Sequence, residues 1–181
     1  MEPPRLIAWR SSDRHFLLIA VILVAVLAAV VTVLYVIHDV RKIDGPSMEP
    51  TLLQSDRVLV TRGYDQPEVG DIVSFTAVDR NGTLARLIKR VVALPGDRVE
   101  IIGDSAYVNG ELSAAAPRAI VGSESYRLGP MTVPGDSVYV LGDNRPVSLD
   151  SRYLGFIPVS SIAGEAVAVI FPPGRIGGID E

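Results

Sequence analysis

The strongest pattern in the sequence is an unbroken apolar segment near the amino terminus. Over residues 16–37 no side chain is charged, and only Thr32 and Tyr35 are polar. As a helix, these 22 residues would extend about 33 Å, which is enough to cross a bilayer. A cleaved signal peptide has a shorter apolar core followed by small residues, whereas here the polar segment 38–42 follows. We therefore predict an uncleaved transmembrane anchor over 16–37, preceded by a polar tail over 1–15.

The basic residues that flank this segment indicate its orientation. Three arginines (Arg5, Arg10 and Arg14) precede it, and Arg41 and Lys42 follow it. Because positive residues tend to stay on the cytoplasmic side of a membrane, the count favours a cytoplasmic tail by one residue. The alternative is a buried core helix, but a small domain rarely buries a helix that has no polar face.

Beyond the anchor the pattern changes to short β-branched runs that follow turn residues. The dipeptides Ser55-Asp56, Gly70-Asp71, Gly96-Asp97 and Gly135-Asp136 each precede such a run, and Asn81-Gly82 and Asn109-Gly110 are hairpin signals. The apolar run 164–171 is too short to span a membrane and predicts a buried strand. We predict a mainly β domain over 38–181, in which the less apolar stretch 103–130 is a small inserted lobe.

Composition narrows the chemistry that this domain can perform. The chain has 181 residues and no cysteine, which excludes disulfides, thiolate catalysis and thiolate metal sites. Its two histidines, His15 and His38, flank the apolar segment on opposite sides, which argues against a zinc site or a Ser/His/Asp triad. A net charge of −4 gives no basic surface for nucleic acid. We predict neither a metal nor an organic cofactor.

The use of lysine singles out one position. Of the 17 basic residues only Lys42 and Lys89 are lysines, and Lys89 lies in the apolar run 87–92. Side chains alternate along a strand, so Lys89 shares its face with Leu87 and Val91. Such a lysine commonly extends its amine to water. The other interpretation is a desolvated amine of lowered pKa that acts as a general base.

A serine suited to such a base lies just beyond the anchor. Ser47 is flanked by Pro46 and Pro50, with Gly45 two positions before it, so it lies in a stiff loop. A stiff loop is also an ordinary place for a turn serine. In a chain without cysteine or a usable histidine pair, however, Ser47 and Lys89 form the simplest nucleophile and base available.

Four segments, in order, resemble the motifs of bacterial-type type I signal peptidases, which are membrane-anchored serine proteases with a Ser/Lys dyad. They are Gly-Pro-Ser-Met-Glu-Pro-Thr-Leu (45–52), Gly-Asp-Ile-Val-Ser-Phe (70–75), Lys-Arg-Val-Val-Ala-Leu-Pro-Gly-Asp (89–97) and Gly-Asp-Asn-Arg-Pro-Val-Ser-Leu-Asp-Ser-Arg (142–152). With the anchor, the resemblance covers about residues 16–171. It implies a signal-peptidase-like β-fold, which the self-cleaving SOS repressors share.

The resemblance also implies a role for each matched residue. Ser47 would be the nucleophile and Lys89 its general base, and Ser148 would hydrogen-bond the lysine amine. The backbone N–H of Ser47 would stabilise the oxyanion. At Gly45 some members of the family carry a serine that donates a second hydrogen bond, which this chain lacks.

Two further groups of residues follow from the same resemblance. Asp143, Asp150 and Arg152 would support the catalytic loop, and we expect both carboxylates to pair with Arg145 or Arg152 and not to contact the lysine amine. The shallow substrate pockets, which would select small residues one and three positions before the cut, would be formed by apolar side chains, and no charged residue matches a pocket position. These are Ile43, Met48, Leu52, Leu87 and Ile88.

The sequence thus predicts a plasma-membrane serine endopeptidase that removes signal peptides from exported preproteins. The expected partners are those signal peptides, the lipid bilayer and the protein-export machinery, and no nucleic acid. Two alternatives stay open. One is a self-cleaving Ser/Lys protein, although such repressors carry a DNA-binding region instead of an anchor. The other is a membrane-tethered β-domain that binds peptides without cleaving them.

Overall fold

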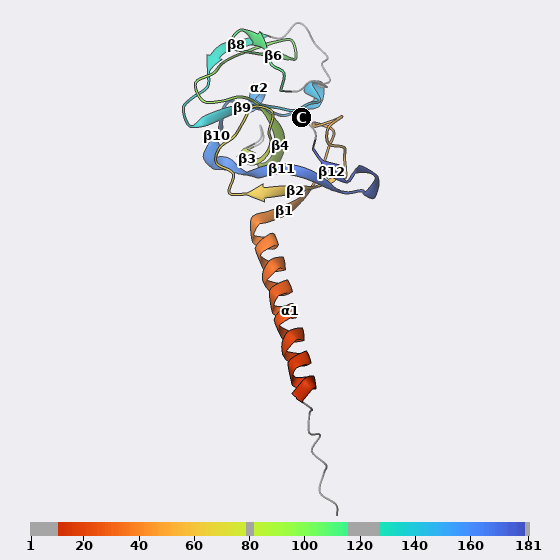
Figure 1. Ribbon diagram of the computed structural model, residues 1–181. Helices are drawn as coiled ribbons and strands as arrows, with labels where there is room; N and C mark the ends of the chain where they lie inside the picture. The colour runs from red at the N-terminus through yellow and green to blue at the C-terminus, as the bar shows by residue number, and fades with distance from the viewer. Residues whose placement is uncertain (1–10, 79–81, 116–126, 180–181) are drawn as a thin grey trace, which may run out of the picture. The chain divides into compact units, whose positions relative to one another are not determined.

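The computed structural model of the protein describes residues 11–78, 82–115 and 127–179, and these form two compact units, Met1–Ile37 and His38–Glu181. In the first unit a single helix, α1 (Ser11–Ile37), is described (Figure 1). Its part Arg14–Ile37 is long and apolar enough to cross a membrane, and none of it is buried within the chain. A core helix would be buried. Arg5 and Arg10, two of the three arginines before the apolar segment, lie outside the described residues.

The second unit is built mainly from strands, as predicted. Their bounds are β1 His38–Lys42, β2 Arg57–Arg62, β3 Ile72–Val78, β4 Leu84–Ala93, β5 Arg98–Ile102, β6 Ser105–Val108, β7 Glu111–Leu112, β8 Arg127–Thr132, β9 Ser137–Leu141, β10 Ile157–Pro158, β11 Ile162–Phe171 and β12 Gly177–Gly178. One short α-helix, α2 (Ser151–Leu154), and three 3₁₀ turns, η1 Arg145–Val147, η2 Val159–Ser161 and η3 Pro173–Arg175, lie among the described residues.

The larger sheet runs in the order β1-β2-β11-β3-β4-β9-β10, with β12 paired to β11. The four turn signals read from the sequence directly precede β2, β3, β5 and β9, which confirms them as strand starts. In three of them, the carboxylates of Asp56, Asp71 and Asp97 accept a hydrogen bond from the backbone N–H three residues earlier. Each aspartate therefore closes its own turn, which is why the same dipeptide recurs.

The smaller sheet has the order β7-β6-β5-β8. The Asn109-Gly110 hairpin joins β6 to β7, and both residues have positive φ, 54° and 91°, as a tight hairpin requires. Of the other hairpin signal, Asn81 lies outside the described residues, but β3 and β4 do pair antiparallel, with Val78 opposite Leu84. The first strand of this sheet along the chain, β5, comes before residue 103, where the predicted lobe begins. Residues 116–126 of the predicted lobe lie outside the described part.

Three apolar clusters hold this unit together. One joins the ends of β4 and β9 to the smaller sheet, through buried side chains such as Val92, Tyr139 and Ile101. A second contains Met48 and Leu52 from the loop that follows β1. The strand predicted over 164–171 is part of β11, but the prediction that it is buried holds only in part: Ala166 and Val169 are buried, whereas Ile170 and Phe171 are exposed. The clusters therefore fix the loop after β1 and strand β4 in one framework.

Candidate active site

Ser47 lies in the loop between β1 and β2, next to a residue whose side chain is packed in the core. The neighbouring side chain of Met48 is 1% exposed, whereas Ser47 itself is half-buried. Gly45 has φ +113°, a conformation that residues with a side chain rarely adopt. The Ser47 carbonyl accepts a hydrogen bond of 3.1 Å from the N–H of Asn144. The position of Ser47 is thus fixed by the buried Met48 side chain on its own loop and by the loop that follows β9.

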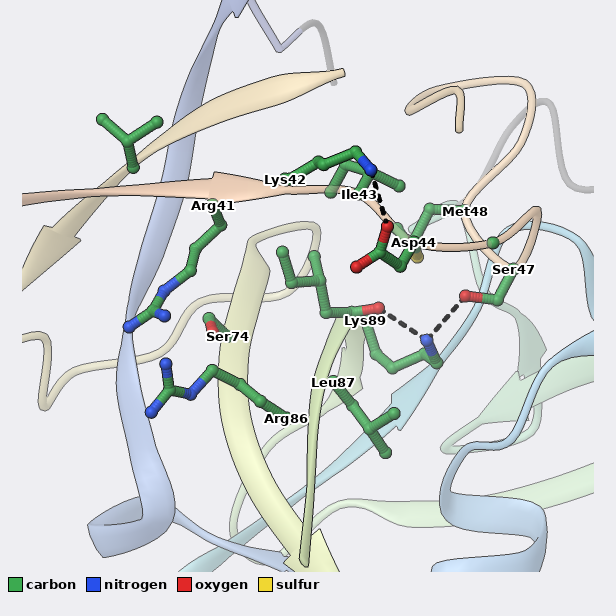
Figure 2. Close-up of a pocket in the computed structure, with 13 residues that line it drawn as sticks. Arg41, Lys42, Ile43, Asp44, Ser47, Met48, Ser74, Arg86, Leu87 and Lys89 are labelled. Carbon is green, nitrogen blue, oxygen red and sulfur yellow. Dashed lines mark hydrogen bonds and ion pairs between the residues drawn. The ribbon is translucent and has the colours of Figure 1, made fainter. Parts of the chain in front are cut away.

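Strand β4 brings Lys89 to this serine. The amine Nζ lies 2.8 Å from Ser47 Oγ and 2.7 Å from the carbonyl oxygen of Ile88 (Figure 2). The lysine is 2% exposed, so its amine does not extend to water as the commoner fate of a lone lysine would require. The two residues singled out from the sequence therefore meet within hydrogen-bonding distance although they are 42 positions apart.

The surroundings of Lys89 lower the pKa of its amine to about 8, chiefly because burial penalises the charged form. The charges of Asp150 and then Asp143 act in the opposite direction and raise this pKa. Neither carboxylate hydrogen-bonds the amine, whose two bonds go to Ser47 and Ile88. The expectation that the acids avoid direct contact holds, but their field still reaches the amine.

Ser148 lies close to this pair without completing it. Its side chain is buried, and Oγ has no hydrogen-bond partner within the described residues, so the expected bond to Lys89 is not present. A Cβ on Gly142 would overlap with the Ser148 side chain and with the Ser47 carbonyl oxygen. Gly142 is therefore a close-approach glycine, and it lets the Ser148 hydroxyl and the Ser47 loop come together.

Asp143 has a different partner from the one expected. Its carboxylate receives hydrogen bonds of 3.0 and 2.8 Å from Nε and Nη2 of Arg90, and neither Arg145 nor Arg152 bonds to it. Thr51 Oγ1 donates to the same carboxylate at 2.6 Å, and Arg90 also donates to the carbonyl of Gly70. The prediction was wrong because Asp143 meets Arg90 from 53 positions further along the chain, a pairing that the local pattern of the strand does not indicate.

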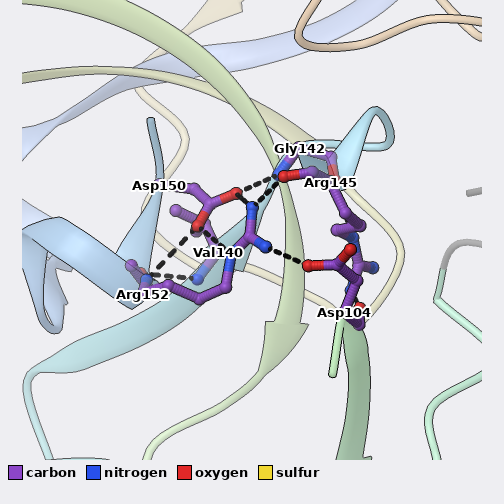
Figure 3. A network of polar contacts seen from close by, with 7 residues as sticks. Asp104, Val140, Gly142, Arg145, Asp150 and Arg152 are labelled. Atoms are coloured by element: carbon purple, nitrogen blue, oxygen red, sulfur yellow. Dashed lines mark hydrogen bonds and ion pairs between the residues drawn. The ribbon is translucent and has the colours of Figure 1, made fainter. Parts of the chain in front are cut away.

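Asp150 does pair with Arg152, and this pair is the centre of a buried network (Figure 3). Arg152 bonds to Asp150 at 2.9 and 3.0 Å and to Asp104 at 2.8 Å. Asp150 also accepts the N–H of Gly142, which fixes the loop that carries Ser148. Arg145 donates to the carbonyls of Gly142 and Asp104 instead of to a carboxylate. The network therefore ties the loop after β9 to the smaller sheet.

A cleft of about 370 Å³ opens beside Ser47 and Lys89 (Figure 2). Four of the five predicted pocket residues line it, namely Ile43, Met48, Leu87 and Ile88. The fifth, Leu52, does not: its side chain is fully buried in the core below Met48. The cleft extends beyond these matched positions, and charged residues line the rest of it, namely Arg41, Lys42, Asp44 and Arg86.

The sequence assigns the stabilisation of an oxyanion to the backbone N–H of Ser47. This N–H is paired with no acceptor among the described residues. Gly45 lines the cleft but has no side chain to donate. Over the described part of the chain, His, Asp and Glu side chains form no group of three that could hold a metal ion.

The sequence did not point to several residues that hold the site. Thr51, Arg90 and Asp104 bond to the predicted carboxylates or arginines, and two of these three lie inside the matched motifs. For Thr51 and Arg90, their place in the matched motifs was the one indication in the sequence that they belong to the site. Asp104 lies in the smaller sheet's β5–β6 turn, and nothing in its local sequence indicates a contact 48 positions away.

A serine hydroxyl hydrogen-bonded to a lysine amine is one of the arrangements found in serine hydrolases. Comparison with known proteins narrows this class. The family model "Signal peptidase, peptidase S26" matches residues 15–171. A probable signal peptidase I-2 of Synechocystis is 37% identical over 147 residues, 78% of this chain and 66% of that protein. Signal peptidase I of Leptolyngbya laminosa is 36% identical over 78% of this chain and 72% of that protein.

Among solved structures, a signal peptidase I from Enterococcus faecalis is 36% identical, with 55% of this chain and 96% of that chain covered and a TM-score of 0.42. The chain spans about two thirds to three quarters of the length of the two relatives named above. On the family model and these identities, the chain belongs to the signal peptidase family, peptidase S26.

Proposed function

We propose that this protein is a membrane-anchored serine endopeptidase that removes signal peptides from exported preproteins, with Ser47 as nucleophile and Lys89 as general base. The observation that carries the proposal is the 2.8 Å contact between Lys89 Nζ and Ser47 Oγ at the end of a cleft. Membership of the signal peptidase family supports the substrate class.

The proposed reaction is acyl transfer in two steps. Lys89 Nζ takes the hydroxyl proton while Ser47 Oγ attacks the scissile carbonyl, and the amine then gives that proton to the departing amino group. A water then attacks the acyl-enzyme ester while Lys89 takes its proton, and Lys89 returns that proton to Ser47 Oγ as the bond from Oγ to the acyl carbon breaks. The Ser47 N–H stabilises the oxyanion. Gly45, at φ +113°, contributes conformation in place of a side-chain donor.

The cleft also offers a backbone edge to an extended substrate. Strand β4 pairs with β9 only from Arg90 onward, so over Leu84–Lys89 it pairs with β3 alone among the described strands. A free strand edge binds an extended peptide through main-chain hydrogen bonds. The walls of Ile43, Met48, Leu87 and Ile88 would then select small apolar residues one and three positions before the cut.

Ser148 and the carboxylates are proposed to support this chemistry. The Ser148 hydroxyl is a buried group left without a partner, next to the close contact between Gly142 and the Ser47 loop. A buried hydroxyl of this kind gains by bonding the lysine amine once a substrate displaces Ser47. Asp143, Asp150 and Arg152 hold the loop in place.

The proposal places residues 1–15 in the cytoplasm, 16–37 in the plasma membrane and 38–181 outside the cytoplasm, with 103–130 as a small inserted lobe. The membrane holds the apolar part of the substrate as well as the anchor, which raises their local concentration for each other. The export machinery would deliver the substrate. Protease added to spheroplasts should digest the domain 38–181, and protection until lysis would reverse this topology.

A cleavage assay with a purified preprotein tests the function itself. The full chain in detergent should release the signal peptide, and Ser47→Ala should not. Cleavage of this chain alone, with the preprotein left intact, would instead favour the self-cleaving alternative. Binding of the preprotein without cleavage would favour the non-catalytic one.

A further inference from the structure

The end of the cleft that lies away from the serine is polar and positively charged. There the cleft is lined by Arg41 from β1, Ser74 from β3 and Arg86 from β4. Figure 2 shows Arg41 and Arg86 extending their guanidinium groups into the space beside Ser74, whereas Ser47 and Lys89 lie at the other end. Near the candidate nucleophile the cleft is thus lined by Met48, Leu87 and the ion pair of Lys42 with Asp44, whereas its far end carries the two arginines.

Two polar atoms at this end are buried and lack a partner within the described residues. They are Ser74 Oγ, on a residue that is 0% exposed, and Arg41 Nε. Nη2 of the same Arg41 guanidinium pairs with Asp39. A buried polar atom without a hydrogen bond is unfavourable, so both atoms would gain from a ligand that brings an acceptor.

Arg86 supplies the charge that is not balanced. Its side chain is exposed, and the described residues offer it no ion pair. Lys42, which also lines the cleft, has Asp44 at 3.4 Å. A carboxylate matches two guanidinium groups and a hydroxyl better than a cation or an apolar group does.

The spacing along β4 identifies the substrate residue that would reach this end. Arg86 precedes Lys89 by three residues, which is about 10 Å along a strand. In an extended peptide, the residues one, three and five positions before the cut point to the same side. The first two are assigned to the small apolar walls. The fifth residue is the next that faces the enzyme, and arginine side chains are long enough to meet it.

We propose that Arg41, Ser74 and Arg86 form a further specificity subsite that favours an acidic residue five positions before the cut and disfavours a basic one there. This inference rests on the proposed endopeptidase function and adds a charge preference to it. The preference is directional, because the amino-terminal side of the substrate must lie toward Arg86.

The test uses the full chain in detergent with a set of soluble peptides that share one cleavable sequence. The fifth residue before the cut is Glu, Gln or Lys, and a matched set varies the second residue, which points away. Glu should exceed Lys in kcat/KM by about fivefold, the size of one exposed ion pair. Arg86→Glu should reverse this order. Arg98→Glu, an equal charge change at an exposed position on β5 in the smaller sheet, should leave it unchanged.

Four outcomes would overturn the proposal. Equal rates for Glu, Gln and Lys, with normal cleavage of all three, would remove the subsite and leave the endopeptidase function standing. A preference that appears equally at the second position would show a general charge effect. A preference seen only with substrate on vesicles of anionic lipid, and lost with soluble peptides, would mean that Arg86 meets lipid. Cleavage of none of the peptides would reject the endopeptidase function and the subsite with it.

Discussion

Lys89 and Arg152 are both buried cations on neighbouring parts of the same unit, yet their surroundings differ in kind. Lys89 bonds to a hydroxyl and a backbone carbonyl, and no carboxylate touches it. Arg152 bonds to two carboxylates, Asp150 and Asp104. Burial lowers the pKa of Lys89 to about 8. Burial also acts to lower the pKa of Arg152, but the hydrogen bond and charge of Asp150, with the charges of Asp104 and Tyr153, outweigh it, so this pKa is raised.

The difference shows how neighbouring parts of one domain can keep Arg152 charged and let Lys89 become neutral. An arginine in practice cannot lose its proton, so a buried arginine needs acceptors, which are carboxylates for Arg152 and backbone carbonyls for Arg145. A lysine can lose it, so an unpaired lysine responds to burial with a lower pKa. Arg90 and Arg152 hold Asp143 and Asp150, the two acids that would otherwise stabilise the Lys89 ammonium most. The structural pairs thereby protect the candidate base.

The largest loss of activity is expected when Lys89 is replaced by a residue that, like Arg152, cannot become neutral. Lys89→Arg keeps the charge but cannot act as a base, so it should lower kcat by about 10²- to 10⁴-fold, as much as Lys89→Ala. Cleavage of a preprotein by the purified variants measures this, and circular dichroism confirms that they are folded. If Lys89→Arg retained most of the activity, the side chain would serve as a charge and not as a base.

The next effect concerns stability. Arg152→Ala leaves Asp150 and Asp104 buried without their cation, which should cost about 3–5 kcal/mol and lower the Tm by about 10 °C. The matched control is Arg127→Ala, which removes the exposed pair with Glu100 at 3.6 Å and should change the free energy of unfolding by at most about 1 kcal/mol. Equal Tm values for the two variants would show that the buried network does not hold the loop.

A smaller effect on turnover should distinguish Ser148 from Ser151, the first residue of α2. Ser151 Oγ accepts the N–H of Val140, whereas Ser148 Oγ is unpaired. Ser148→Ala should therefore lower kcat, by about tenfold for a group that orients the base, with little change in Tm. Ser151→Ala should lower the Tm, because a buried N–H loses its acceptor, and affect kcat less. Near-normal turnover in Ser148→Ala would remove that serine from the mechanism.

Much of the fold was predictable because it depends on local patterns. The apolar segment, the strand starts after Asp56, Asp71 and Asp97, and the Asn109-Gly110 hairpin each follow from a few adjacent residues. The order of strands in the sheets does not, since pairings such as β11 with β2 join residues about 100 positions apart. No local rule specifies such pairings.

The site was predictable in its residue types and only partly in its contacts. The proximity of Ser47 to Lys89 followed from the family resemblance and from the scarcity of lysine and histidine. The pairing of Asp143 with Arg90 did not, because two arginines in the same motif were equally plausible partners. Leu52 matched a pocket position, yet its side chain is directed into the core. Side-chain direction in an irregular loop has no periodicity from which to read it.

The pH dependence of kcat/KM for the full chain shows whether Lys89 acts as a neutral base. With the pKa at about 8, about one amine in five is neutral at pH 7.4, against about one in a thousand for a free lysine. Because the neutral form is the active one, the rate should rise with pH, about tenfold per unit well below pH 8, and level off above about pH 9. A rate that still rises toward pH 10, or that is flat between pH 6 and pH 9, would show that Lys89 does not act as a neutral base with a pKa of about 8.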